Sequence, residues 1–370
     1  MTSRRWRRLL PPSSAGGPAK TPISSQRCAS TCTRPSTPSC PARGSAGQGH
    51  SPPTRRSRVP HAPPKICVVG SSNMDLISRV PHLPRLGETI VGHSFHMGYG
   101  GKGANQAVMA AKLRAQVTMV TKLGRDVFGE GSLGNYRQQG VETTYVLFDS
   151  ERASGVAPIF VDDNAQNSIV IVPGANMGLS PADVRRSTPA IQAADALICQ
   201  LEIPVETTLE AFRIAKAAKV RTILNPAPAA ALPDELLRLC DFCVPNETET
   251  ESLTGRAVTT VEEAAAAGRI LLGRGPRVVI ITLGARGALV LDAGTPEYVP
   301  SIRVDAVDPT GAGDAFIGSL AVFLGEGASL LDAVGRANAV AALSVTRIGT
   351  QTSFPSRDEA DRFFTQHRLA

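Results

Sequence analysis

The chain has 370 residues, enough for one large α/β domain, and a formal net charge of +7. Residues 1–65 hold 12 Lys and Arg and no Asp or Glu, so residues 66–370 carry 27 basic against 32 acidic residues. The high pI therefore belongs to the N-terminal segment, and we expect no nucleic-acid partner. No apolar run approaches the length that crosses a bilayer, so we also expect no membrane association.

Residues 1–64 differ in composition from the rest of the chain. They contain 12 of the 28 prolines, many serines and a single aromatic residue, Trp6. Such a segment buries too little apolar surface to offset its conformational entropy. We therefore predict a disordered basic tail over residues 1–64 and a folded domain over residues 65–370.

The number of cysteines and the composition of the N-terminus indicate the cellular compartment of the protein. The seven cysteines are an odd number scattered along the chain, which favours a reducing compartment over a disulfide framework. We expect a cytoplasmic protein, with the nucleus as a second compartment. Four arginines among the first eight residues resemble part of a mitochondrial transit peptide. Mitochondrial targeting is the weaker alternative, because prolines from Pro11 onward interrupt an amphipathic helix.

From Lys65 onward, short apolar runs alternate with amphipathic helical stretches. The runs that indicate buried parallel strands are 66–70, 117–120, 196–199, 222–224, 242–244 and 278–283, and the helical stretches include 207–218 and 261–272. Strands that alternate with helices over some 300 residues are typical of an α/β domain with a central, mainly parallel sheet.

Two segments, 77–99 and 155–172, interrupt that alternation. Both contain short apolar runs with alternating exposure, which predict antiparallel strands rather than helical crossovers. We expect them to form a small separate sheet that covers a site as a lid and leaves edges for pairing with another subunit.

The segment Gly98–Gly103 matches the dinucleotide-binding fingerprint literally but not in context. It comes about thirty residues after the first strand instead of in the turn that follows it. It is not a phosphate-binding P-loop either, because Lys102 is followed by glycine and not by Ser or Thr. The helix start nevertheless offers Gly100, Gly101, Lys102 and Asn105, whose donors suit the hydroxyls of a small polar ligand.

A second glycine-rich helix start lies within residues 306–319. Gly311 and Gly313 let the amides of Gly311, Ala312 and Gly313 converge, and the helix dipole adds to their attraction for an anion. Asp314 in the first helical turn is expected to be ionised at neutral pH and to accept a proton beside the bound anion. An anion hole next to a base indicates group transfer from a phosphate donor. Alternatively, these residues form only a capped helix start.

Five short motifs follow one another along the chain. They are Gly70–Asp75, Gly100–Ala107, Asn246–Glu249, Thr282–Gly284 and Asp308–Asp314. Together they resemble the PfkB carbohydrate kinase family, and within it the branch that phosphorylates D-ribose, from about residue 65 to 355. The resemblance implies a Rossmann-like three-layer α/β/α domain with a β lid that also forms a homodimer interface.

The resemblance assigns residues to the sugar, to ATP and to the chemistry. The residues that would hold D-ribose are Asn73, Asp75, Gly100, Gly101, Lys102, Asn105 and Glu202. Those that match the ATP site are Asn246, Thr282, Leu283, Gly284, Ala285, Arg286, Gly287, Gly313 and Asn338. Asp314 would be the catalytic base that takes the proton of the 5-hydroxyl, while the amides of Gly311, Ala312 and Gly313 stabilise the transferring charge.

The resemblance also implies Mg²⁺ with ATP and K⁺ as a monovalent activator. Glu249 would act on Mg²⁺ through water, and phosphates and water would supply most of the other ligands. The positions that match the K⁺ site are Asp308, Thr310, Ser344, Arg347, Gly349 and Ser353. Pro309 departs from the family pattern because it removes an amide, which an oxygen-liganded cation tolerates.

Other acceptors remain open at this stage. Fructose, adenosine or deoxyribose are the substrates of the nearest alternatives in the family, and a catalytically inactive scaffold is the alternative of another class. The motifs present polar groups and no aromatic wall for a base, which favours ribose over adenosine.

Overall fold

The computed structural model describes residues 62–164 and 166–369. These described residues form one compact unit. Apart from residues 62–64, the predicted tail and its targeting signal lie outside the described residues. Among the described residues, no helix is long and apolar enough to span a membrane.

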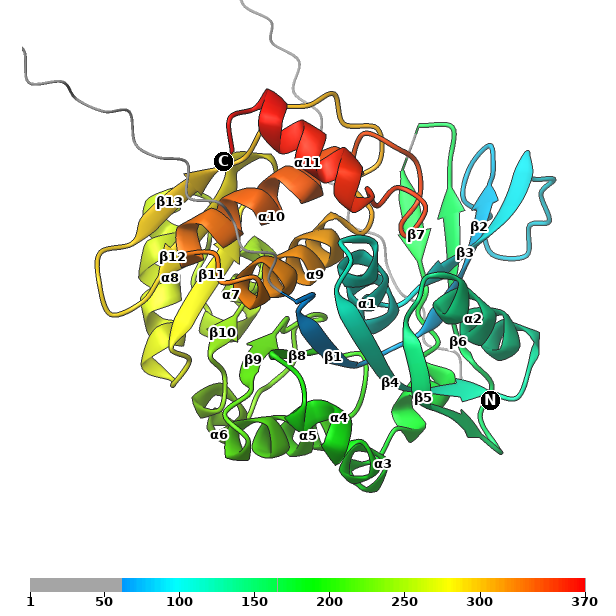
Figure 1. Ribbon diagram of the computed structural model, residues 1–370. Helices are drawn as coiled ribbons and strands as arrows, with labels where there is room; N and C mark the ends of the chain where they lie inside the picture. The colour runs from blue at the N-terminus through cyan, green and yellow to red at the C-terminus, as the bar shows by residue number, and fades with distance from the viewer. Residues whose placement is uncertain (1–61, 165, 370) are drawn as a thin grey trace, which may run out of the picture. The chain divides into compact units, whose positions relative to one another are not determined.

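The larger sheet of the unit has nine strands in the order β13-β12-β11-β10-β9-β8-β1-β4-β5 (Figure 1). They are β1 (Lys65–Val69), β4 (Gln116–Gly124), β5 (Glu142–Asp149), β8 (Ala196–Cys199), β9 (Arg221–Leu224), β10 (Phe242–Cys243), β11 (Val278–Thr282), β12 (Gly287–Leu291) and β13 (Glu297–Pro300). Strands β5 to β11 of this order are parallel, and β12 and β13 add an antiparallel edge. The predicted parallel sheet is confirmed.

Helices cover both faces of this sheet. They are α1 (Lys102–Lys112), α2 (Val127–Gln138), α3 (Pro181–Arg186), α4 (Thr188–Gln192), α5 (Val205–Ala217), α6 (Asp234–Arg238), α7 (Glu247–Thr254), α8 (Val261–Gly273), α9 (Ala312–Gly325), α10 (Leu330–Ser344) and α11 (Arg357–Gln366), with 3₁₀ turns η1 (Gly174–Gly178) and η2 (Gly284–Arg286). Successive side chains of a strand point to opposite faces. In β1, Ile66 and Val68 accordingly belong to the core cluster that includes side chains of α1, α9 and α10, whereas Cys67 and Val69 belong to the cluster that includes side chains of α5 and α8. The three-layer α/β/α architecture is therefore confirmed.

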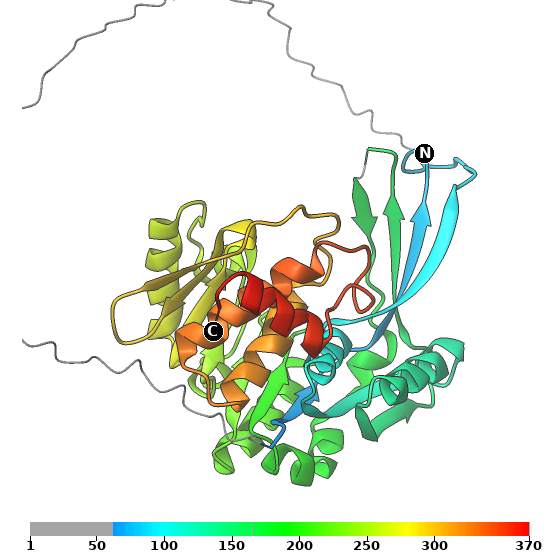
Figure 2. The same cartoon turned by 45° about the horizontal axis from the view of Figure 1, so that its top comes forward.

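A second sheet of four strands, in the order β3-β2-β6-β7, extends away from the helical layers (Figure 2). Its strands are β2 (Asn73–Arg79), β3 (Ser94–Gly100), β6 (Gly155–Val161) and β7 (Asn167–Ile169). It is the predicted lid sheet with two differences. The pairing of β2 with β6 is parallel, and residues 80–93 between β2 and β3 are not strand. The strand β2 also starts at Asn73, four residues before the predicted segment, so Asn73 and Asp75 lie inside the strand.

Candidate active site

The site lies where the chain order of the large sheet reverses. After β1 the chain continues to β4 and β5 on one side, and it later places β8 on the other side of β1. The crevice outside the carboxyl ends of the strands at such a switch point is where open α/β sheets bind ligands. Here Ser71, just after β1, donates its hydroxyl hydrogen to Glu202, just after β8, over 2.5 Å. Glu202 also accepts the amide hydrogen of Lys102 at 3.0 Å, which ties the start of α1 to this crevice.

The start of α9 shows why glycine is needed there. Gly311 has φ of 79°, and a Cβ atom on it would lie 2.5 Å from Cγ2 of Thr350. The helix begins without a side-chain cap. The amide of Ala312 donates to the carbonyl of Pro309 at 3.2 Å, so it does not take part in the predicted anion hole. The first-turn amides of Gly313 and Asp314 remain the donors that a helix start offers to an anion.

Asp314 is buried, with 7% of its surface exposed. Its two carboxylate oxygens accept hydrogen bonds of 2.9 Å from Nδ2 of Asn105 and Nε2 of Gln106. Burial raises the pKa of Asp314 above its ordinary value, against the opposing effects of the Lys102 charge and the two amides. Asp314 lies in the first turn of α9 as predicted, and its burial was not predicted from the sequence because it results from the packing of α9 along its whole length.

A cavity of about 180 Å³ adjoins Asp314. Predicted residues from four parts of the sequence line it together, namely Lys102, Asn246, Glu249, Thr282, Gly311, Gly313 and Asp314, joined by Asn225, Ala227, Val244 and Ile317. Glu249 is mostly buried, and burial raises its pKa while the amide of Asn246 and the charge of Lys102 lower it. One cavity therefore holds the candidate base, an ammonium group and residues predicted for ATP and Mg²⁺.

The residues predicted for the sugar come together at the base of the lid. The pairing of β2 with β3 sets Asn73 opposite Gly100 and Asp75 opposite Gly98. A Cβ atom on Gly100 would lie 2.3 Å from an oxygen of Asp75, so only glycine permits this approach. Burial, with the negative charges of Glu202 and Asp314, raises the pKa of Asp75 to about 7. Three carboxylates, those of Asp314, Glu202 and Glu249, lie around Lys102. Burial lowers the pKa of Lys102, but the negative charges of these carboxylates raise it above its ordinary value.

The residues predicted for ATP fall into two groups. Asn246 and Glu249 form a capping box at the start of α7, and Thr282 ends β11 beside them. Gly313 also lines the cavity. The remaining predicted positions do not: Leu283 is buried in the core, Gly284, Ala285 and Arg286 form η2, and Gly287 begins β12 with φ of 113°. The side chain of Asn338 donates to the carbonyl of Val299 at 3.0 Å, which ties α10 to β13.

The positions that match the K⁺ site lie in two loops that meet. Asp308 accepts the amide hydrogens of Thr310 and Gly349, each at 2.9 Å. These amides and the Thr310 hydroxyl lower the pKa of Asp308 against the effect of burial, so it is ionised at neutral pH. The hydroxyls of Ser344 and Ser353 donate to nearby carbonyls, and the guanidinium of Arg347 pairs with Glu359 at 2.6 Å. Arg347 could therefore contribute only a backbone oxygen.

The sequence motifs did not identify several polar residues that lie at the site. Asn176 donates to Oδ1 of Asn73 at 2.7 Å and accepts the amide hydrogen of Ser72, so it fixes the start of β2. Gln106 follows Asn105 inside a motif that was recognised, and Asn225 directly follows β9. These two positions in the sequence could have identified Gln106 and Asn225 as site residues. Asn176 lies in the 3₁₀ turn η1, which no sequence motif marks.

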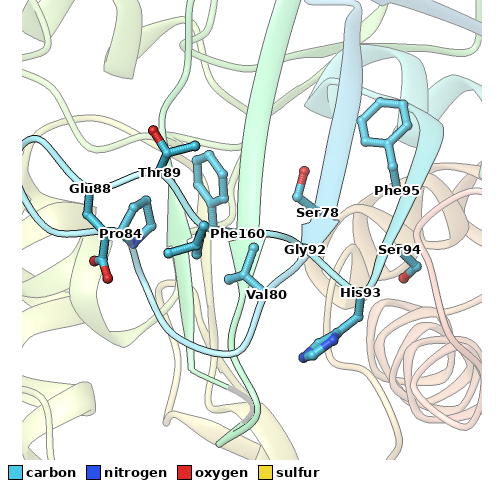
Figure 3. A pocket seen from close by; sticks show the side chains of 11 residues that line it. Ser78, Val80, Pro84, Glu88, Thr89, Gly92, His93, Ser94, Phe95 and Phe160 are labelled. Atoms are coloured by element: carbon cyan, nitrogen blue, oxygen red, sulfur yellow. The ribbon is translucent and has the colours of Figure 1, made fainter.

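A second hollow lies in the lid, where the segment that joins β2 and β3 folds over β6 (Figure 3). Val80, Pro84 and Phe160 form its apolar wall, and none of the predicted site residues lines it. It has no acid–base constellation of its own, because His93 pairs outward with Asp163 at 3.1 Å.

A helix start with open amides, a buried carboxylate and a lysine at the switch point of an α/β sheet define a kinase of small polar molecules. Comparison with known proteins gives the family. The model of the pfkB family of carbohydrate kinases matches residues 63–357. The chain therefore belongs to the pfkB family and is a carbohydrate kinase.

Relatives within the family are similar over most of the domain. A ribokinase of Mus musculus is 44% identical over 299 residues, which cover 80% of this chain and 93% of the relative. A deoxyribokinase of Salmonella typhi is 43% identical over 301 residues, covering 81% and 98%. The structure of Arabidopsis thaliana ribokinase complexed with ribose and ATP is 33% identical, with a TM-score of 0.77, and covers 82% of this chain and 99% of that one.

Proposed function

We propose that this chain transfers the γ-phosphate of ATP to the 5-hydroxyl of D-ribose, giving D-ribose 5-phosphate and ADP. The observation that carries the proposal is the position of Asp314, which is buried at the start of α9 and lines the cavity shared with Lys102, Asn246 and Thr282. On its other side, Asn105 links Asp314 to the helix start that holds Glu202. Relatives named ribokinase at about two-fifths identity support ribose as the acceptor.

The chemistry follows from the groups around Asp314. Its carboxylate takes the proton of the 5-hydroxyl as that oxygen bonds to the γ-phosphorus and the bond to the β–γ bridging oxygen breaks. The first-turn amides of α9 and the ammonium of Lys102 offset the negative charge of the transferring group. Asp75, Asn73 and Glu202 accept or donate hydrogen bonds to the sugar hydroxyls, which orients the 5-hydroxyl toward the base.

Mg²⁺ would enter with ATP and neutralise the charge of its phosphates. Glu249 fits an indirect role, because both of its carboxylate oxygens already accept hydrogen bonds from Asn246, at 2.9 and 3.1 Å. It therefore supplies negative charge at the cavity wall to water around the ion. We expect no transfer when Mg²⁺ is chelated and recovery when it is restored.

K⁺ is proposed as an activator bound beside the α9 start. Asp308 fits because it is an ionised carboxylate held by the amides of Thr310 and Gly349, in a segment that offers backbone oxygens. An ion there orders residues 308–311 without touching the sugar. The expected result is a higher kcat in K⁺ than in Na⁺ at equal ionic strength, and equal rates in the two salts would remove the site.

A second candidate acceptor is 2-deoxy-D-ribose, favoured by the 43% identity to the Salmonella typhi deoxyribokinase. Transfer from ATP to D-ribose, 2-deoxyribose, fructose and adenosine, measured with the full chain in Mg²⁺ and K⁺, decides between the acceptors. We expect the highest kcat/KM for D-ribose. A preference for 2-deoxyribose would keep the Asp314 chemistry and replace the substrate.

The lid is proposed to pair with the lid of a second copy in a homodimer. One face carries Phe95 and Met97, which alternate with exposed polar residues along β3 and are 56% and 62% exposed. The strands β3 and β7 end the sheet and leave open edges. Sedimentation of the wild type and of Met97→Asp should give a dimer and a monomer respectively, and a monomeric wild type would contradict the proposal.

A further inference from the structure

Six side-chain carboxamides extend outward from Asp314 in two arms. In one arm, Asn105 donates to Oδ2 of Asp314 at 2.9 Å, Gln351 donates to Oδ1 of Asn105 at 3.0 Å, and Asn135 donates to Oε1 of Gln351 at 2.8 Å. In the other arm, Gln106 donates to Oδ1 of Asp314 at 2.9 Å.

The second arm continues into the large sheet. Gln200, at the end of β8, donates to Oε1 of Gln106 at 2.5 Å, and Gln106 also donates to Asn225 at 3.2 Å. Gln106 and Gln200 have no exposed surface, and Asn105, Asn135 and Gln351 are 5–7% exposed. Burial at this level makes an unmatched polar atom costly. Within the described part of the chain the second arm ends at one such atom, Oε1 of Gln200.

The two arms have a fixed direction. An ionised carboxylate can only accept hydrogen bonds, so Asn105 and Gln106 must both turn their NH₂ groups toward Asp314. Their oxygens then face outward and require donors, which Gln351 and Gln200 supply. The oxygen of Gln351 in turn faces Asn135, which donates to it. The charge of one residue therefore sets the orientation of carboxamides on α1, on α2 and in the loop before α11.

We propose that Gln106 and Gln351 are positioning residues that hold the carboxylate of Asp314 in one orientation and in its ionised form. This role rests on the proposed function only in assigning Asp314 as the base. The residues touch Asp314 or Asn105 and lie outside the cavity lining. They act through another residue, so their removal changes the titration of Asp314 more than the binding of ATP.

Other charges also face Asp314. The ammonium of Lys102 on α1 favours its ionised form, while Glu202 after β8, Asp75 on β2 and Glu249 on α7 oppose it. These charges stay in place when a carboxamide is replaced by methionine. A hydrogen bond to the charged form lowers the pKa of a carboxyl group, so losing one raises that pKa.

The direct test is the titration of the Asp314 carboxyl in the full chain without substrate. ¹³C NMR of aspartate-labelled protein follows each carboxyl, and the signal missing from Asp314→Asn assigns the one of interest. We expect Gln106→Met to raise the midpoint by about one pH unit and Gln351→Met, which acts through Asn105, by about half a unit. The readout needs no sugar, so it separates this proposal from the choice of ribose.

Two further variants keep the test sharp. Asn135→Leu removes the outer donor from α2, away from the loop that carries the predicted K⁺ ligands, and should raise the midpoint by a few tenths of a pH unit. Thr352→Val is the control in that loop, because the Thr352 hydroxyl donates only to the carbonyl of Ile348 and should leave the midpoint unchanged. An unshifted midpoint in both Gln106→Met and Gln351→Met, with folding confirmed by circular dichroism, would overturn the proposal.

Discussion

The helices that begin at the site and the helices that begin elsewhere use different chemistry for the same structural task. Away from the site, the helices α3, α8 and α11 start with capping boxes, in which a side chain such as Thr260 or Ser356 satisfies first-turn amides. The capping box of α7 lines the cavity and belongs to neither group. The helices α1 and α9 start instead at Gly101 and Gly311, with φ of 87° and 79° and no side-chain cap. The glycine start of α9 leaves the amides of Gly313 and Asp314 for a ligand, whereas the first amides of α1 bond to Glu202 and Ser71 and fix the helix start in the crevice.

That contrast separates two kinds of variant. Changes at the glycine starts should alter kcat with little change in stability beyond the local strain. Changes at the capping boxes should alter the free energy of unfolding and leave kcat unchanged.

The largest effect is expected at the functional start of α9, from Asp314→Asn. The amide keeps the size of the side chain but cannot take the proton of the sugar hydroxyl, so kcat should fall about 100-fold or more. Steady-state kinetics with saturating ATP and ribose measure it, and the KM for ATP should stay within a few-fold. Near-normal turnover would remove Asp314 from the role of base.

The next largest effect is expected from substitution of Asp75, which should change the free energy of unfolding in a direction that follows from its pKa. Its pKa is raised to about 7 from an ordinary value of 3.8. Between these values the folded state holds a proton that the unfolded state has lost, so the free energy of unfolding falls as pH rises through this window. At pH 8, Asp75→Asn should raise the free energy of unfolding of the substrate-free protein by on the order of 2 kcal/mol.

At pH 4 that difference should nearly vanish, because Asp75 is then neutral in the folded protein. Urea unfolding at the two pH values measures both. A destabilised variant at pH 8 would show that the Asp75 carboxylate is compensated by charges not recognised here.

Gly311→Ala should lower kcat by about ten-fold, because the new Cβ atom displaces the loop at Thr350 and strains the left-handed backbone. The matched control is Gly140→Ala, whose glycine has φ of 72° and open space around it. Both variants carry the backbone strain and Gly311→Ala adds the clash with Thr350, so Gly311→Ala should lose at least as much free energy of unfolding as Gly140→Ala. Only Gly311→Ala should lose activity, and an equal loss in both would break the contrast.

The smallest effect is expected at a structural helix start, from Thr260→Ala. Its hydroxyl accepts the amide hydrogen of Glu263 in the capping box of α8. Its loss should lower the free energy of unfolding by about 1 kcal/mol. The kcat for ribose should not change, and a change there would mean that capping boxes and glycine starts are coupled.

The sequence predicts most of the fold because the parallel strands of the large sheet are buried on both faces. Runs such as Ile66–Val69 and Val278–Ile281 are continuously apolar. Such a strand is recognised even when its predicted end is wrong by one residue. The strand β5 was missed because Glu142–Asp149 lies at the sheet edge and is mostly half-exposed. The start of β2 was missed because Asn73 and Asp75 are polar residues on a buried face.

The residues of the site also fall into those that the sequence identifies and those that it does not. Asp314, Gly311 and Lys102 stand in motifs whose spacing is local, so the sequence identifies them. Gln351 could not be found that way, because its partner Asn105 is 246 positions away and only the folded chain brings them together. The raised pKa of Asp75 likewise depends on Glu202 and Asp314, which come from distant parts of the sequence.

One measurement tests the central claim most directly: the ³¹P NMR spectrum of the product that the full chain forms from ATP and D-ribose in Mg²⁺ and K⁺. A phosphate on the 5-oxygen couples to the two protons of C5, so the predicted result is a new triplet from the wild type and none from Asp314→Asn. A signal split by one proton, no new phosphate ester, or an unchanged triplet from Asp314→Asn would contradict it.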